Sequence, residues 1–188
     1  MEYNINSSFN SHISLIEELK KNSQSFIEES SKLIINTILS KNNIFWCGNG
    51  GSASDALHLS AEFNGKFIND RIPLNSTCLN SNISVLTCIS NDYDFADVFS
   101  RQLEANAQKN DLLISFTTSG NSMNIVKALE CANKKEINSI SFLGKDGGLV
   151  KGFSTFEYIV KSNITARIQE AHILLGHIIC EIVDQKFI

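Results

Sequence analysis

The chain has 188 residues, 43% of them hydrophobic, and a single proline, which suits one globular domain and excludes a disordered or collagen-like chain. Its formal net charge of -4 comes from 20 acidic and 16 basic residues that are well mixed, so no basic stripe favours nucleic-acid binding. We expect a cytoplasmic protein without membrane association, because there is no signal-like start, no apolar run of ~20 residues and no CxxC pair among the five scattered cysteines.

Residues 8–40 have the periodicity of amphipathic helix, with a candidate break at residues 21–24. Two apolar stripes run along this segment, formed by Ile13, Ile16 and Leu19 and by Ile27, Ile34 and Ile38. So much apolar surface ahead of the first strand needs a partner, and a helix bundle between subunits is a natural one. His12 lies in a polar stretch here and is expected to be solvated.

From residue 41 to the end, short apolar runs alternate with helical patterns. Strands are expected at 43–47, 75–79, 111–116, 138–143 and 156–160. Helices are expected at 52–66, 81–90, 95–108, 122–135 and 166–186. This alternation predicts a single α/β domain over 1–188, with a parallel sheet covered by helices on both faces. Ligands of such sheets bind beyond the carboxyl ends of the strands.

The glycine-rich loop GNGGS, residues 48–52, follows the first strand and opens a helix. Three glycines among four residues suggest that a ligand approaches the backbone, and a helix N-terminus favours an anion; the alternative is a tight strand-to-helix turn. In the helix that follows, His58 and Glu62 are four residues apart and share one face. They are a candidate metal or acid/base pair, with a helix-surface interaction as the alternative.

A second polar loop, TTSGNS at residues 117–122, follows the strand at 111–116. Its hydroxyls and the helix N-terminus after it would suit a phosphate group, although Ser, Thr and Asn also favour an ordinary N-cap turn. The loop is neither a Walker A motif nor a GxGxxG fingerprint. Asn91 and Asp92 are a turn signal first and a candidate site second.

The last helix carries His177 among apolar neighbours, where a histidine is most often a core residue. Spacing alone pairs it with Glu170, seven residues earlier, while Gln169 falls on the same broad side of the helix. Spacing does not choose between them, nor does it say whether His172 takes part.

Four segments, GNGGSASDALHLSAEF, SNDYDFADVFSRQLEA, TTSGNS and TARIQEAHILLGH, resemble in order and spacing those of the phosphoheptose isomerases. These are sedoheptulose 7-phosphate isomerases of the sugar-isomerase (SIS) superfamily, and the resemblance extends from near the N-terminus to the C-terminus. It implies a three-layer sandwich around a five-stranded, parallel, flavodoxin-like sheet. It also implies a homotetramer, with the N-terminal helices bundled at the centre and active sites shared between subunits.

The resemblance also implies site residues. One zinc ion per subunit would be bound by His58, Glu62, Gln169 and His177. The substrate would contact Asn49, Gly50, Gly51, Ser52, Glu62, Asn91, Asp92, Thr117, Thr118, Ser119, Ser122 and Gln169. Its phosphate would lie in the second loop, at Thr117, Thr118, Ser119 and Ser122. Lys66 and Ile164 depart from residues frequent in the family, and each could shift substrate preference.

The reaction implied is the isomerisation of D-sedoheptulose 7-phosphate to D-glycero-D-manno-heptose 7-phosphate, the entry to heptose units of lipopolysaccharide or capsule. The resemblance assigns Glu62 as the base and His177 as the acid of an enediol mechanism. One alternative is a non-catalytic SIS tetramer that binds a replication initiator protein or senses sugar phosphates. Another is an isomerase of a different phosphorylated ketose.

Overall fold

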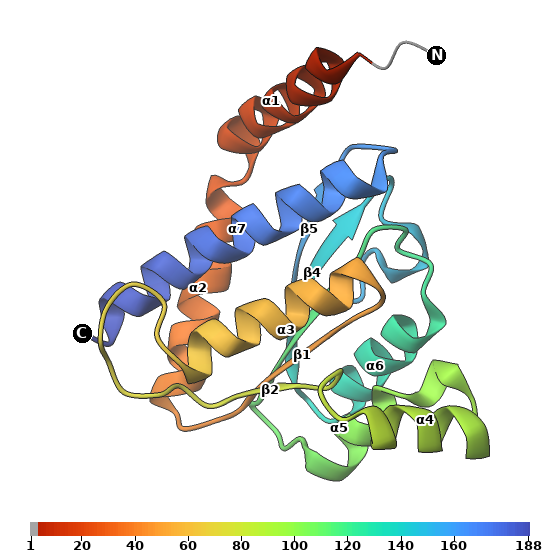
Figure 1. The fold of residues 1–188 in the computed structure, drawn as a ribbon. Helices are drawn as coiled ribbons and strands as arrows, with labels where there is room; N and C mark the ends of the chain where they lie inside the picture. The colour runs from red at the N-terminus through yellow and green to blue at the C-terminus, as the bar shows by residue number, and fades with distance from the viewer. Residues whose placement is uncertain (1–3) are drawn as a thin grey trace.

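The computed structural model describes residues 4–188, in which helices alternate with the strands of one parallel sheet (Figure 1). The strands are β1 (Ile44–Gly48), β2 (Ser76–Cys78), β3 (Leu112–Thr117), β4 (Asn138–Gly144) and β5 (Phe156–Val160). The helices are α1 (Ile5–Asn22), α2 (Gln24–Leu39), α3 (Gly51–Asn64), α4 (Ile83–Asp92), α5 (Ser100–Asn106), α6 (Met123–Lys134) and α7 (Thr165–Lys186). All five predicted strands are present, each within two residues of its expected bounds.

The sheet has the strand order β2-β1-β3-β4-β5, and every neighbouring pair is parallel. This is the order of flavodoxin-like sheets, so the expected fold class is confirmed. One core, with Trp46 and Phe116, lies under α2, α3 and α7, and a second, with Phe45 and Leu113, lies under α4, α5 and α6. Strand order reverses between β1 and β3, and the loops that follow these two strands are GNGGS and TTSGNS.

The N-terminal segment forms two helices that part at Ser23, inside the predicted break. Ser23 turns its N–H and its hydroxyl back to the Leu19 carbonyl, at 2.9 and 2.8 Å. Figure 1 shows α1 projecting beyond the sheet, near the start of α7. His12 is not merely solvated there, as expected from sequence, because its Nδ1 lies 2.6 Å from Glu170 Oε2 on α7. The partner lies 158 residues away, beyond the reach of local sequence patterns.

The prediction of one helix at 95–108 is wrong for the first half of that range. Residues Phe95–Asp97 form a single 3₁₀ turn, and α5 begins only at Ser100. The Asp94 carboxylate accepts the Ala96 N–H at 2.7 Å, which caps this separate turn. Val98 and Phe99 then bury their side chains in the core between the two helices. The apolar residues that predicted one continuous helix are therefore apolar because Val98 and Phe99 are buried in the core.

A buried ion pair ties the segment between α3 and β2 to α7. Arg71 Nε donates to Asp184 Oδ1 at 2.9 Å, and the two side chains are only 2% and 1% exposed. The Arg71 guanidinium also donates to the backbone carbonyls of Glu62 and Phe63, at 2.7 and 3.0 Å. These carbonyls belong to the last turn of α3, so the C-terminal end of α3 is fixed to α7. Within residues 4–188, no helix is long and apolar enough to span a bilayer.

His172 on α7 is fully buried beside the rings of Phe116 and Phe142. Its Nε2–H donates to the Leu143 carbonyl at 3.0 Å, while its Nδ1 has no hydrogen-bond partner. Burial lowers the pKa of His172 to about 4. The unfolded chain, with an ordinary histidine pKa of about 6.5, binds this proton more readily.

His172 should therefore make folding stability depend on pH. Its contribution is fully present above pH ~6.5 and is lost as the pH falls toward 4, to a total of about 3 kcal/mol. Denaturant unfolding at pH 7 and pH 4.5 should show a larger loss in the parent than in His172→Gln, which keeps an amide donor but cannot titrate. Equal losses in the two proteins would contradict this prediction.

Candidate active site

Helices α3 and α7 lie side by side across one face of the sheet, and two glycines permit their close approach (Figure 1). A Cβ atom on Gly176 of α7 would lie 2.4 Å from Leu59 Cδ1 of α3. At the start of α3, a Cβ atom on Gly51 would lie 2.3 Å from Gln169 Nε2. A larger residue at Gly176 would displace the buried Leu59 side chain, and one at Gly51 would displace the Gln169 amide.

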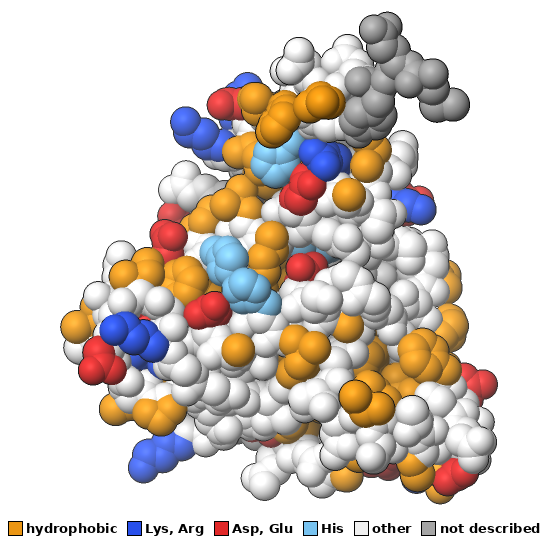
Figure 2. Space-filling model, viewed as in Figure 1, with side chains coloured by type: hydrophobic (Ala, Val, Ile, Leu, Met, Phe, Trp, Pro, Cys, Tyr) orange, Lys and Arg blue, Asp and Glu red, His pale blue; other side chains and the backbone are white. Residues whose placement is uncertain are grey.

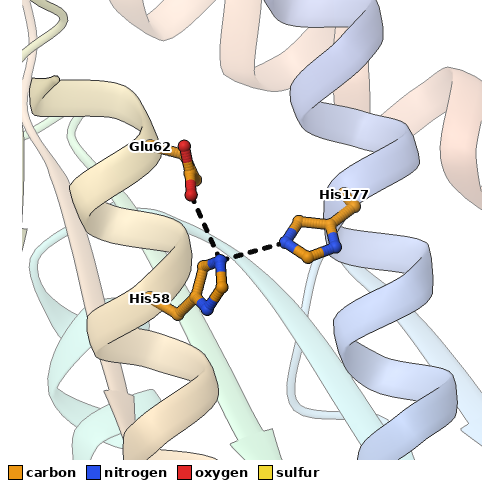
Figure 3. Close-up of side chains that lie close together, drawn as sticks. All are labelled: His58, Glu62 and His177. Atoms are coloured by element: carbon orange, nitrogen blue, oxygen red, sulfur yellow. Dashed lines mark hydrogen bonds and ion pairs between the residues drawn. The ribbon is translucent and has the colours of Figure 1, made fainter. Parts of the chain in front are cut away.

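Three of the predicted site residues meet across this contact (Figure 3). His58 Nε2 lies 3.1 Å from Glu62 Oε1 on the same helix and 3.2 Å from His177 Nε2 on α7. The ligating atoms of all three residues lie within 4.8 Å of one another. The side chains of His58 and Glu62 are 51% and 23% exposed, and Figure 2 shows histidines open to solvent on this face. The cluster is therefore within reach of a ligand.

The chemistry and spacing of this cluster fit a metal ion. Tetrahedral zinc with ligands at about 2.0–2.1 Å needs donor atoms roughly 3.3 Å apart. The two separations from His58 Nε2 are close to this value, and all three residues have ligating atoms within 4.8 Å of one another. Two imidazoles and a carboxylate are also a donor set that suits zinc. Burial, and then the neighbouring His58, lower the pKa of His177, so its ring is neutral near pH 7. Neutral imidazole is the form that ligates metals.

Gln169, the fourth predicted ligand, lies nearer the glycine loop. Its side-chain amide packs against Gly51, and eight residues of α7 separate it from His177, about 12 Å along the axis. Its role as a ligand stays a prediction. Glu170, the alternative partner in sequence, instead pairs with His12 and, at 2.7 Å, with Arg167. The side chain of His172 is enclosed in the core, outside the cluster.

The two predicted loops meet around a small cavity of about 40 Å³. Its lining is mostly hydroxyl and amide, and consists of Asn49, Ser52, Phe116, Thr117, Thr118, Ser119 and Ser122. Among these described lining residues there is no lysine or arginine. The helices α3 and α6 both begin at this cavity, so their N-terminal N–H groups add to the hydroxyl donors. The cavity has the chemistry of a site for a small anion.

Internal hydrogen bonds shape the TTSGNS loop. The hydroxyl of Thr117 accepts the Gly120 N–H at 3.1 Å, and that of Ser119 accepts the Asn121 N–H at 3.2 Å. Gly120 has a φ of +68°, and a Cβ atom there would lie 2.0 Å from the Gly147 carbonyl oxygen. The glycine in this loop is therefore required by the backbone, whether or not a ligand is bound.

Sequence reasoning missed a second, wider hollow of about 400 Å³ beside the cavity. It is lined by Asn49, Asp94, Phe95, Ala96, Ser122, Met123 and Asn124. Asp94, as the N-cap of the 3₁₀ turn, carried a sequence signal that the helical reading of 95–108 obscured. Asn91 and Asp92 lie at the end of α4, joined by a 2.8 Å hydrogen bond, and line neither hollow. Their contact with substrate stays a prediction.

Comparison with known proteins identifies the family. The model of the SIS domain matches residues 9–144. The phosphoheptose isomerase of Helicobacter pylori is 44% identical over 97% of this chain and 95% of its own length. That of Clostridium acetobutylicum is 43% identical, with 97% and 94% covered.

Two solved structures agree with these matches. A phosphoheptose isomerase from Francisella tularensis superposes with a TM-score of 0.93 at 32% identity, over 96% of each chain. That from Neisseria gonorrhoeae superposes with a TM-score of 0.89 at 34% identity, over 96% of this chain and 97% of that one. Because the likeness in sequence and in structure covers nearly the whole chain, this protein belongs to the phosphoheptose isomerase family of SIS-domain enzymes.

Proposed function

We propose that the enzyme converts D-sedoheptulose 7-phosphate to D-glycero-D-manno-heptose 7-phosphate, the first step toward heptose for lipopolysaccharide or capsule. The observation that carries the proposal is the cluster of His58, Glu62 and His177, formed between α7 and α3, the helix that begins at the hydroxyl-lined cavity. A module that only binds a replication initiator or senses sugar phosphates would not need this cluster. We place the reaction in the cytoplasm, since all five cysteines are free thiols.

The spacing of cavity and cluster supports a long substrate. Six residues of α3 separate Ser52, which lines the cavity, from His58, and this corresponds to about 9 Å along the helix axis. An extended seven-carbon chain with a terminal phosphate has a comparable length. With its phosphate among Thr117, Thr118, Ser119 and Ser122, such a sugar would place C1 and C2 near the cluster.

The reaction moves one proton between carbons and one between oxygens. Glu62 would take the proton from C1 of the ketose and return it to C2, which passes the sugar through an enediol. His177 would donate a proton to O2 and accept one from O1, so that the carbonyl moves from C2 to C1. The Glu62 carboxylate lies 3.1 Å from His58 Nε2, which in turn lies 3.2 Å from His177 Nε2, so the proposed base and acid flank the same imidazole.

We further propose that each subunit binds one zinc ion through His58, Glu62 and His177, with Gln169 as the fourth ligand. The donor set and its spacing support the assignment for His58, Glu62 and His177, whereas Gln169 rests on the family resemblance alone. When bound, zinc would supply a Lewis acid for the carbonyl oxygen and a template for the sugar.

Replacing the proposed base should stop turnover with little effect on the fold. Glu62→Gln keeps the shape of the side chain but removes its basicity, so kcat should fall by about 10² or more. Glu29→Gln, on the exposed face of α2, is a matched control and should leave kcat unchanged. Conversion of sedoheptulose 7-phosphate followed by NMR measures both. Near-parental turnover in Glu62→Gln would exclude it as the base.

Elemental analysis tests the proposed metal. The purified parent should contain up to one zinc per chain, and the double change His58→Ala with His177→Ala should abolish it, because two of three clustered ligands are removed. His12→Ala removes a histidine of the same surface outside the cluster and should retain the metal. Stoichiometric zinc in the double variant would show that the metal lies elsewhere.

Apolar surface on the N-terminal helices supports a homotetramer with shared active sites. Ile5, Phe9 and Ile13 follow one another at helical spacing on α1 and are exposed. Beside them, an apolar hollow of about 540 Å³ lies between α1, α2 and α7, lined mainly by Ile16, Leu19, Ile27, Leu174, Leu175, Ile178 and Ile182. Surfaces of this kind commonly bind another chain.

Light scattering at micromolar concentration should accordingly give the mass of four chains. The double change Phe9→Ser with Ile13→Ser should lower that mass, because it removes apolar area from the proposed contact. Ile72→Ser, at an equally exposed position in the segment after α3, should not. A monomeric parent protein would refute both the tetramer and the sharing of active sites.

A further inference from the structure

The two loops at the cavity are joined by a reciprocal pair of side-chain amides. Asn49 Nδ2 donates to Asn124 Oδ1 at 2.9 Å, and Asn124 Nδ2 donates to Asn49 Oδ1 at 2.8 Å. Asn124 is only 2% exposed. The pair bridges 75 residues of sequence, from the turn after β1 to the first turn of α6.

Asn49 is the member of the pair that reaches the ligand sites. It lines both the 40 Å³ cavity and the 400 Å³ hollow, whereas Asn124 lines only the hollow. Asn49 also lies in a turn that is held elsewhere, because Asn80 bonds to both the N–H and the carbonyl of the preceding Gly48, at 3.2 and 2.9 Å. Asn80 thus fixes the backbone of the turn, and Asn124 fixes the side chain of Asn49.

We propose that Asn124 is a positioning residue for the phosphorylated substrate. By holding the Asn49 amide, it fixes the distance between GNGGS and TTSGNS, and so the shape of the cavity between them. This inference rests on the proposed function, because it assigns the substrate phosphate to that cavity. Asn124 would act on the ligand only through Asn49.

The physical reason is that the lining of the cavity would have to bind the phosphate without a lysine or arginine. Several hydroxyls and backbone N–H groups must then point at the same small volume, and each of their hydrogen bonds weakens if its donor is moved or turned. The amide pair is well suited to fix two loops, since two parallel hydrogen bonds define both distance and orientation. If Asn124 is replaced, the half-buried amide of Asn49 loses its hydrogen-bond partner and is free to turn away from the cavity.

The test is a double-mutant cycle on Asn49→Leu and Asn124→Leu. Each single change should raise KM for sedoheptulose 7-phosphate by about tenfold or more, with kcat within about threefold, since the cluster at His58 is untouched. Competition by inorganic phosphate should weaken in parallel. The double variant should bind no worse than Asn49→Leu alone, because Asn124 acts through Asn49.

Controls separate this inference from simple stability and from the proposed function. Asn133→Leu, at the other end of α6, also loses an amide hydrogen bond and should leave KM unchanged. If Asn124→Leu does not fold, the uncharged Asn124→Ser cannot form the reciprocal amide pair and should still weaken phosphate binding. An unchanged KM in Asn124→Leu, or fully additive effects in the double variant, would overturn the inference. If the parent binds phosphate but does not isomerise the heptose, the proposed function fails while the phosphate arm of the cycle still decides the role of Asn124.

Discussion

The close contact of α3 with α7 is the constraint on which the site depends. Gly51 and Gly176 leave room for Gln169 and Leu59, so the two helices approach over several turns. Across this contact, His177 Nε2 lies 3.2 Å from His58 Nε2. The parallel sheet makes the contact possible, since it sends both helices back across the same face. The small residues in this contact therefore contribute to the placement of the cluster.

The two halves of the site use different chemistry. The cluster concentrates groups that titrate or bind metal, in a place open to solvent. The cavity, by contrast, offers neutral donors and helix N-termini, which attract an anion without binding it as strongly as lysine or arginine would. Under the proposed function, this cavity would recognise the phosphate by the geometry of neutral donors more than by net charge.

The sequence predicted the features that depend on neighbouring residues. Apolar runs located all five strands, and the spacing of His58 and Glu62 placed both on one helical face. Geometry alone did not pair His177 with them; the family resemblance did. Contacts between distant segments were beyond reach, including the amide pair 75 residues apart and the partner of His12. The prediction of a helix at 95–108 was wrong in its first half, because the buried Val98 and Phe99 gave the segment a spacing of apolar residues like that of a helix.

Helix α3 is held at both ends by side-chain contacts, and these contacts fix the distance between the glycine loop and the C-terminal turn of the helix. At its start, the Asn49–Asn124 pair joins the glycine loop to the second loop. At its end, the buried Arg71–Asp184 ion pair caps the carbonyls of the last turn and ties them to α7. A helix held in this way keeps a constant distance between the cavity at its N-terminus and the carboxylate of Glu62 near its C-terminus. If the proposed function is correct, this distance selects the length of the sugar, because a shorter phosphorylated ketose bound in the same cavity would not bring C1 and C2 to the base.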